Sequence, residues 1–168
     1  MSLLEMLQQR HSIRKYTDED ITDRDLQTIL QAGLLSASGR AARPWEFIVV
    51  RDKEMLQKMS ESRVGAAKML AHANAAIVVI ADVSKTDVWV EDCSIAMSNM
   101  HLAASVLGIG SCWIHRAKET FESPEGKELL KQWGIEGNYE GIGHLILGYA
   151  KGEAPAPKPR KENYMSTM

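Results

Sequence analysis

A long apolar segment is the feature that most constrains how this chain can fold. From Val88 to Leu107 the residues are mostly apolar and rich in Ala, Met, Leu and Ser, without proline or glycine, which indicates one continuous helix. Its length, on the order of 20 residues, would suit a membrane span. However, Glu91, Asp92 and His101 lie within it, and ionisable groups at bilayer depth are costly. We therefore expect this helix in a protein core or at a subunit interface.

Four shorter apolar runs predict the strands of a sheet. These runs are 47–50, 75–81, 109–115 and 142–149. The first two are continuous rather than alternating, which is typical of strands buried on both faces. Ahead of them, a short amphipathic helix is expected near residues 3–7 and another helix over 22–34, with Thr22 as its N-cap. Strands alternating with helices predict an α+β fold, a mixed α/β sandwich with helices on both faces of the sheet.

The chain length of 168 residues fits one domain with a sizeable core. We expect residues 1–152 to form this domain. Residues 153–168 contain several prolines, which cannot join a helix or an inner strand, so an extended C-terminal arm is expected there. No basic and apolar leader follows Met1, and a cytoplasmic location is expected.

The charge balance argues against two classes of partner. The formal net charge is −2, whereas nucleic acids and anionic membranes usually require a strong positive excess. Neither partner is expected, and the basic residues are better explained as local binding sites. Cys93 and Cys112 lack C-x-x-C spacing and lie in apolar stretches, so both are interpreted as buried thiols. The five histidines show no metal-ligand spacing, and no metal site is expected.

Two basic clusters at opposite ends of the chain are suited to bind one small dianion. They are Arg10-His11-Ser12-Ile13-Arg14-Lys15-Tyr16 and Lys158-Pro159-Arg160. Arginine offers paired, charge-assisted donors to phosphate, and the serine hydroxyl adds a neutral donor. Further motifs lie between the clusters, in the order 36–47 with its Pro-Trp pair, Lys68-Met69-Leu70, 107–115 with Gly-Ile-Gly-Ser-Cys-Trp, and Leu147-Gly148-Tyr149.

In this order, from Arg10 to Arg160, the motifs resemble the FMN-dependent nitroreductase family. The resemblance implies a nitroreductase-like fold with a central mixed sheet, a long core helix and exchange of terminal segments between two subunits. It also implies a homodimer with FMN at the subunit interface and NADH or NADPH as electron donor. The implied activity is reduction of nitroaromatic or quinone-like acceptors by a ping-pong mechanism, in which the flavin carries the chemistry and no catalytic residue is required.

The resemblance further implies which residues bind the cofactor. The expected set is Arg10, His11, Ser12, Arg14, Ser38, Gly39, Lys68, Trp113, Ile114, His115, Lys158 and Arg160. The first basic cluster corresponds to early flavin contacts, and the C-terminal pair corresponds to residues that hold the phosphate. Lys68 would place a cation near the pyrimidine end of the ring, which residues 113–115 would flank. Ser38 and Gly39 correspond to a segment that reaches the flavin from the partner subunit.

Several positions depart from the family pattern. Ala41 and Arg43 stand where the family commonly has Asn and Gln, Gly65 where it can have Asn, and His115 and Arg116 where it more often has an acid and a glycine. Because alanine cannot hydrogen-bond a ligand through its side chain, the affinity for flavin could be reduced or redistributed. Ala41, Gly65 and the short connection 82–87, which leaves the pocket uncovered, favour the alternative function, a non-catalytic FMN-binding or sensory module. A third reading, a thiol-based redox protein, requires the two cysteines to be oxidisable to each other.

Overall fold

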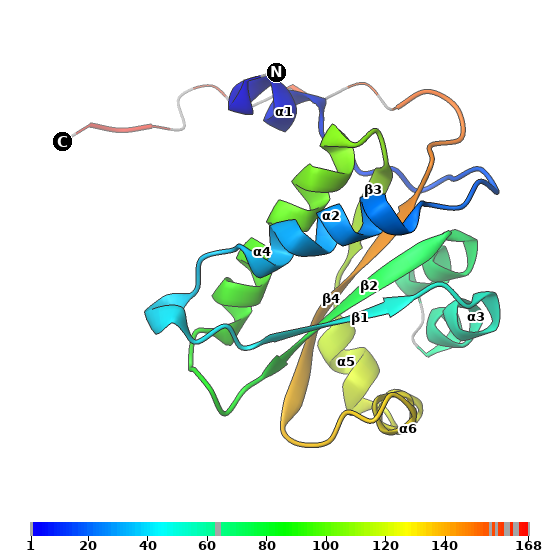
Figure 1. The fold of residues 1–168 in the computed structure, drawn as a ribbon, viewed down its shortest axis with the longest axis vertical. Helices are drawn as coiled ribbons and strands as arrows, with labels where there is room; N and C mark the ends of the chain where they lie inside the picture. Colours follow the sequence, from blue (N-terminus) through cyan, green and yellow to red (C-terminus); the bar gives the residue numbers. More distant parts are fainter. Residues whose placement is uncertain are drawn as a thin grey trace.

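The centre of the fold is a four-stranded sheet with the strand order β1-β2-β4-β3 (Figure 1). The computed structural model describes residues 2–62, 65–154, 156, 158–159, 162 and 165–167. Its strands are β1 (Trp45–Val50), β2 (Ala75–Asp82), β3 (Gly110–Ile114) and β4 (Tyr139–Gly148). All four were expected from the apolar runs, and the strands extend or shorten those runs by a few residues.

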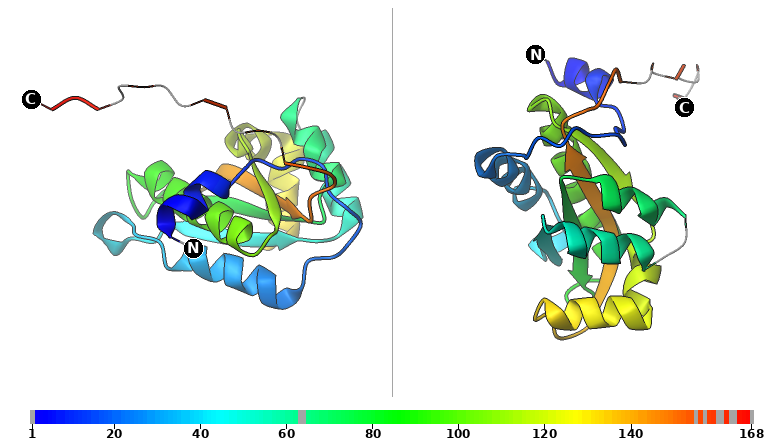
Figure 2. Two further views of the ribbon diagram at one scale, coloured as in Figure 1. Left: turned by 90° about the horizontal axis from the view of Figure 1, so that it is seen from above. Right: turned by 90° about the vertical axis from the view of Figure 1, so that its right-hand side faces the viewer.

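Helices cover both faces of this sheet (Figures 1 and 2). They are α1 (Leu3–Gln9), α2 (Asp23–Leu34), α3 (Lys53–Glu61), α4 (Trp89–Val106), α5 (Ala117–Glu122) and α6 (Pro124–Gln132), with 3-10 helices η1 (Gly39–Ala41) and η2 (Ala66–His72). On β2, Val78 and Ile80 belong to the core with α3, η2, α5 and α6. Ile77 and Val79 belong to the core with α2 and α4. The prediction of burial on both faces is confirmed for β2, but it is wrong for the edge strand β1, where residues 47–49 are only half-buried. The α+β fold class is confirmed.

The three pairings between the named strands are all antiparallel, whereas a mixed sheet was expected. Helix α3 and η2 return the chain to the end of the sheet where β1 finishes, so Val50 pairs with Ala76. A parallel pair would need a crossover to the opposite end. In the described part of the chain, parallel pairing is limited to an isolated bridge between Ser12 and Ser111.

Helix α4 is the long apolar helix expected from the sequence. Its inner face buries Cys93, Met97 and Met100 completely. Its outer face nevertheless exposes Val90 and Ile95, so the apolar character continues around the helix. Among the described residues, no helix is both long and apolar enough to cross a membrane.

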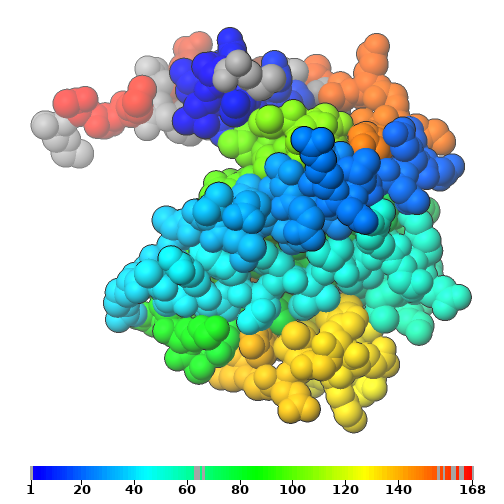
Figure 3. All heavy atoms as spheres, viewed as in Figure 1, coloured from blue at the N-terminus to red at the C-terminus, as the bar shows by residue number. Residues whose placement is uncertain are grey.

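The two ends of the chain lie at the same end of the molecule, beyond the sheet (Figures 2 and 3). An antiparallel bridge joins Tyr16 to Ala150, and the backbone N–H of Lys151 donates to the Lys15 carbonyl over 2.9 Å. From Glu153 onward, the described residues are all exposed. The division into a domain of residues 1–152 and an arm of residues 153–168 stays a prediction.

Candidate functional site

A cavity of about 570 Å³ opens where the segment after α1, the second half of α4 and the end of β3 meet. Residues that line it and that the sequence predicted are Arg10, Ser12, Arg14, Trp113, Ile114 and His115. Met69, Ser98, His101, Cys112 and Arg116 complete the lining. No aspartate or glutamate is among these described lining residues. The cavity, called the cationic pocket below, therefore presents positive charge without a compensating carboxylate.

The segment carrying the first basic cluster is held against the edge of β3. The Ile13 backbone N–H donates to the Ser111 carbonyl over 2.9 Å, and the Tyr16 hydroxyl donates to the Ile13 carbonyl over 2.6 Å. A side chain at Gly110 would place its Cβ 2.8 Å from the Ile13 Cγ2 atom. Glycine at this position thus allows the close approach that brings Arg10 and its neighbours to the pocket.

His101 is the buried polar group of the pocket wall. Its Nε2 lies 2.7 Å from the Nη1 atom of Arg10, and its Nδ1 lies 2.6 Å from the Ser111 hydroxyl oxygen. Burial, together with the positive charge of Arg10, lowers the pKa of His101 to about 4. The imidazole is therefore neutral near neutral pH, although it lies beside a guanidinium group.

Five of the lining residues are not among the expected cofactor contacts, namely Met69, Ser98, His101, Cys112 and Arg116. His101 gave a usable signal, because a lone histidine in an otherwise apolar helix needs a polar partner when it is buried. Its partner Arg10 is remote in sequence, so no local pattern could identify the pair. Met69, Ser98 and Cys112 resemble ordinary core or surface residues in sequence, and Arg116 stands out only as a departure from the family pattern.

Ser38 and Gly39 lie outside the cationic pocket, near the start of α4. The Gly39 backbone N–H donates to the buried Asp92 carboxylate over 2.8 Å. Asp92 and His101 are both on α4, and a rise of about 1.5 Å per residue places them roughly 13 Å apart along the helix axis. Ser38 and Gly39 therefore do not contribute to the cationic pocket of their own chain.

The other expected residues also lie outside the lining. Lys68 is exposed on η2, next to Met69, and His11 is half-buried. Lys158 is exposed on the C-terminal segment. Arg160 lies outside the described residues. Their expected contacts with a cofactor stay predictions.

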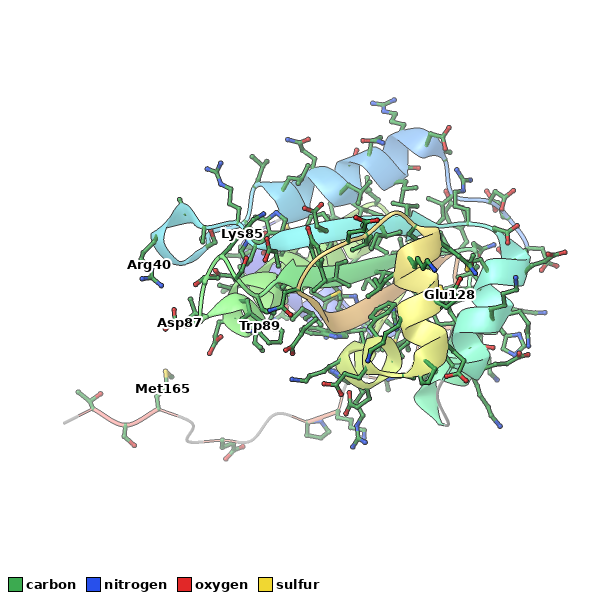
Figure 4. All side chains as sticks on the ribbon, turned by 90° about the horizontal axis from the view of Figure 1, so that it is seen from below. Arg40, Lys85, Asp87, Trp89, Glu128 and Met165 are labelled. Carbon is green, nitrogen blue, oxygen red and sulfur yellow. The ribbon has the colours of Figure 1, made fainter. Side chains whose placement is uncertain are left out.

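The backbone around η1 is unusual at the positions that depart from the family pattern. Arg40, Ala41 and Arg43 have φ angles of 54°, 55° and 45°, in the left-handed region that residues other than glycine rarely adopt. Arg40 forms an exposed ion pair of 2.8 Å with Asp87 (Figure 4). Gly65 has a φ of 95° and a ψ of −125°, which accounts for glycine at that departure. Strained backbone of this kind is often found at functional sites.

The two cysteines lie on opposite faces of the sheet. Cys93 belongs to the core beside α2 and α4, and Cys112 belongs to the core beside α3 and α5. Burial raises the pKa of Cys93 to about 12 and also raises the pKa of Cys112. The structure therefore agrees with two buried thiols, and the sheet between them argues against a thiol redox pair.

Comparisons with known proteins agree with this fold. The model of the nitroreductase family matches residues 7–66 and 56–149. A protein of Archaeoglobus fulgidus, provisionally named NADH dehydrogenase/NAD(P)H nitroreductase, is 46% identical over 154 residues, which are 89% of this chain and 86% of that protein.

Two solved structures share the fold over almost the whole chain. An FMN-dependent nitroreductase from Clostridium difficile R20291 has a TM-score of 0.84 and 39% identity, covering 93% of this chain and 92% of its own. A nitroreductase with bound FMN from Bacteroides fragilis has a TM-score of 0.89 and 29% identity, covering 100% and 99%. The family model matches most of the chain, and the archaeal relative is 46% identical over 89% of it. This chain therefore belongs to the nitroreductase family.

Proposed function

We propose that this chain is an FMN-dependent oxidoreductase, which uses NADH or NADPH to reduce nitroaromatic or quinone-like acceptors. The observation that carries the proposal is the cationic pocket, because it combines several cations with an apolar wall and lacks a carboxylate in its described lining. The names of the relatives support the same cofactor and electron donor.

The residues present suit the two chemically different ends of FMN. A phosphate carries close to two negative charges and is well matched by Arg10, Arg14 and the Ser12 hydroxyl. Trp113 and Met69 offer an aromatic and a polarisable apolar surface to a flat ring. The volume of about 570 Å³ lies within the usual range of small-molecule sites.

When bound, FMN supplies the hydride and electron transfer. Arg10, Ser12 and Arg14 would hold the phosphate, and Trp113 and Met69 would orient the ring. Because one pocket would serve the electron donor and the acceptor in turn, we propose a ping-pong mechanism. None of the chain's own residues is assigned as a catalytic acid or base.

We further propose a homodimer with the pocket at its interface. Helix α1 buries none of its residues in the single chain, and it exposes 62% of Leu3 and 70% of Leu4. Such a short helix is marginal without packing. Val90 and Ile95 extend the exposed apolar surface along α4, and a second copy of the chain would cover both regions.

The dimer also gives a role to the η1 segment. Ser38 and Gly39 lie beside the start of α4, away from the pocket of their own chain. The same segment of a partner subunit would complete that pocket. The proposed cofactor set thus combines the residues lining the pocket with Ser38 and Gly39 of the other subunit. His11, Lys68, Lys158 and Arg160 are further proposed contacts of the cofactor. The cytoplasmic location expected from the sequence stays a prediction.

The visible spectrum of the purified protein tests the activity. Addition of NADH or NADPH without oxygen should bleach the yellow flavin, and a quinone or nitroaromatic compound should restore the colour. Initial rates at several concentrations of both substrates should give the parallel double-reciprocal lines of a ping-pong mechanism. A yellow protein that neither nucleotide bleaches would favour the non-catalytic FMN-binding module instead.

A further inference from the structure

A chain of polar side chains passes from the cationic pocket into the core. It begins at the guanidinium group of Arg10, continues through the imidazole of His101 and ends at the hydroxyl of Ser111. The two heavy-atom distances are 2.7 Å and 2.6 Å. His101 and Ser111 are 7% and 2% exposed, so water competes little for their hydrogen bonds.

The chemistry of arginine fixes the tautomer of His101. A guanidinium group has donors only, so the Nε2 atom facing Arg10 must accept a hydrogen bond. A neutral imidazole then carries its proton on Nδ1 and donates it to the Ser111 hydroxyl oxygen. Arg10 therefore donates a hydrogen bond to His101, and His101 donates one to Ser111.

We infer that His101 is a positioning residue, whose neutral imidazole accepts a hydrogen bond from the Arg10 guanidinium and holds it so that the remaining donors face a phosphate group in the pocket. The inference rests on the proposed function. Because one N–H of the long Arg10 side chain is already held, the side chain loses less conformational entropy when its other N–H groups bind a ligand.

A neutral partner suits this task better than a carboxylate. Aspartate or glutamate would bind Arg10 more strongly, but it would cancel the charge that attracts the phosphate and compete with it for donors. Histidine holds the arginine and leaves its full positive charge available. The ionisable groups that line the pocket with His101 are Arg10, Arg14, Cys112, His115 and Arg116. The cations among them oppose protonation of the imidazole.

The first arm of the test measures the tautomer. In protein labelled with ¹⁵N at histidine, long-range nitrogen–proton correlations near neutral pH should show His101 as neutral and protonated on Nδ1. This arm needs no cofactor. A His101 that is protonated on Nε2, or that is doubly protonated near neutral pH, would overturn the inference.

The second arm compares FMN with riboflavin, which lacks the phosphate, in fluorescence titrations. His101→Leu should lower the FMN affinity about tenfold, the scale of one lost charged hydrogen bond, and should leave riboflavin nearly unchanged. His101→Gln offers a carbonyl acceptor in place of Nε2 and should recover most of the loss. His72→Leu is the matched control, because His72 is exposed and does not line the pocket.

Equal losses for FMN and riboflavin in His101→Leu, or unchanged FMN affinity, would overturn the inference. If that variant fails to fold, Ser111→Ala replaces it. This change removes the acceptor for Nδ1–H and should still reduce FMN affinity more than riboflavin affinity. A wild-type protein that binds no FMN would contradict the proposed function. The tautomer of His101 would still be measured, because that experiment needs no cofactor.

Discussion

Arg14 lies where several cavities of the described structure meet. It lines the cationic pocket and two neighbouring cavities that also contain Lys15 and Lys151. Its Nη1 atom donates to the Ser12 carbonyl over 3.1 Å, and the residue is exposed. Such a side chain keeps several donors available for a ligand.

Arg14→Ala should therefore weaken FMN binding by about 1.5–3 kcal/mol, the scale of a charge-assisted hydrogen bond. Riboflavin should be affected far less, because it has no phosphate. Fluorescence titration with both ligands measures the difference. Lys15→Ala is the control, since Lys15 is the next cation along the chain but does not line the cationic pocket. An equal loss for both ligands would show that Arg14 supports the structure rather than the phosphate.

His101 should make the stability of the fold depend on pH. Its pKa falls from 6.5 to about 4 on folding, so the unfolded chain binds the proton more readily between these values. The neutral His101 contributes fully to the free energy of unfolding above about pH 6.5, and this contribution is lost as the pH falls towards 4. Urea unfolding should show this loss, up to about 3 kcal/mol. The stability of His101→Leu should decline less over the same interval, and parallel profiles for the two proteins would contradict the assignment.

At the scale of elements, η1 and the start of α4 form one unit. Asp92 is 3% exposed and accepts from the Gly39 N–H, directly before the left-handed residues Arg40 and Ala41. A buried carboxylate in the first turn of a helix also interacts favourably with the helix dipole. This contact stabilises a backbone that is costly in itself.

Asp92→Ala should destabilise the protein by about 1–3 kcal/mol, because it leaves the half-buried Gly39 N–H without its acceptor. Hydrogen exchange should accelerate at residues 38–43. Asp87→Ala is the matched control, since its ion pair with Arg40 is largely exposed on both sides and such pairs contribute less than about 1 kcal/mol. If both variants lose the same stability, the buried contact does not hold the segment.

The C-terminal arm is the second element with a specific expectation. Its described residues are exposed, and its base is held beside Lys15 through Lys151, near the first basic cluster. A chain ending at Glu153 should fold but lose most of its FMN affinity, by two to four orders of magnitude if two contacts of roughly 1.5–3 kcal/mol add. Lys158→Ala combined with Arg160→Ala should reproduce most of the loss. A truncated protein that stays yellow through gel filtration would contradict this role.

The sequence predicted the elements whose patterns are local. The strands and α4 follow from runs of apolar residues, and α2 follows from its Thr22 cap. Helices α3 and α6 were not predicted, although Asp52 and Ser123 cap them, because each is short and mostly polar. Strand order and direction depend on contacts between distant segments, as does the pairing of Arg10 with His101. Local patterns carry no information about either.

At the scale of the whole molecule, the described surface is incomplete as a single chain. The apolar residues of α1 and the outer face of α4 lie exposed, while the N- and C-terminal segments share one end of the molecule (Figure 3). Ser38 and Gly39 lie away from the pocket that they are proposed to complete. A two-fold dimer would bury the apolar surface and supply this segment from the partner.

Native mass spectrometry of the FMN-loaded protein tests this account most directly, because it counts chains and cofactors in one measurement. We expect a complex of two chains with two FMN molecules, and we expect FMN to be lost when the complex is separated into single chains. A single chain that retains FMN with undiminished affinity would contradict the shared site.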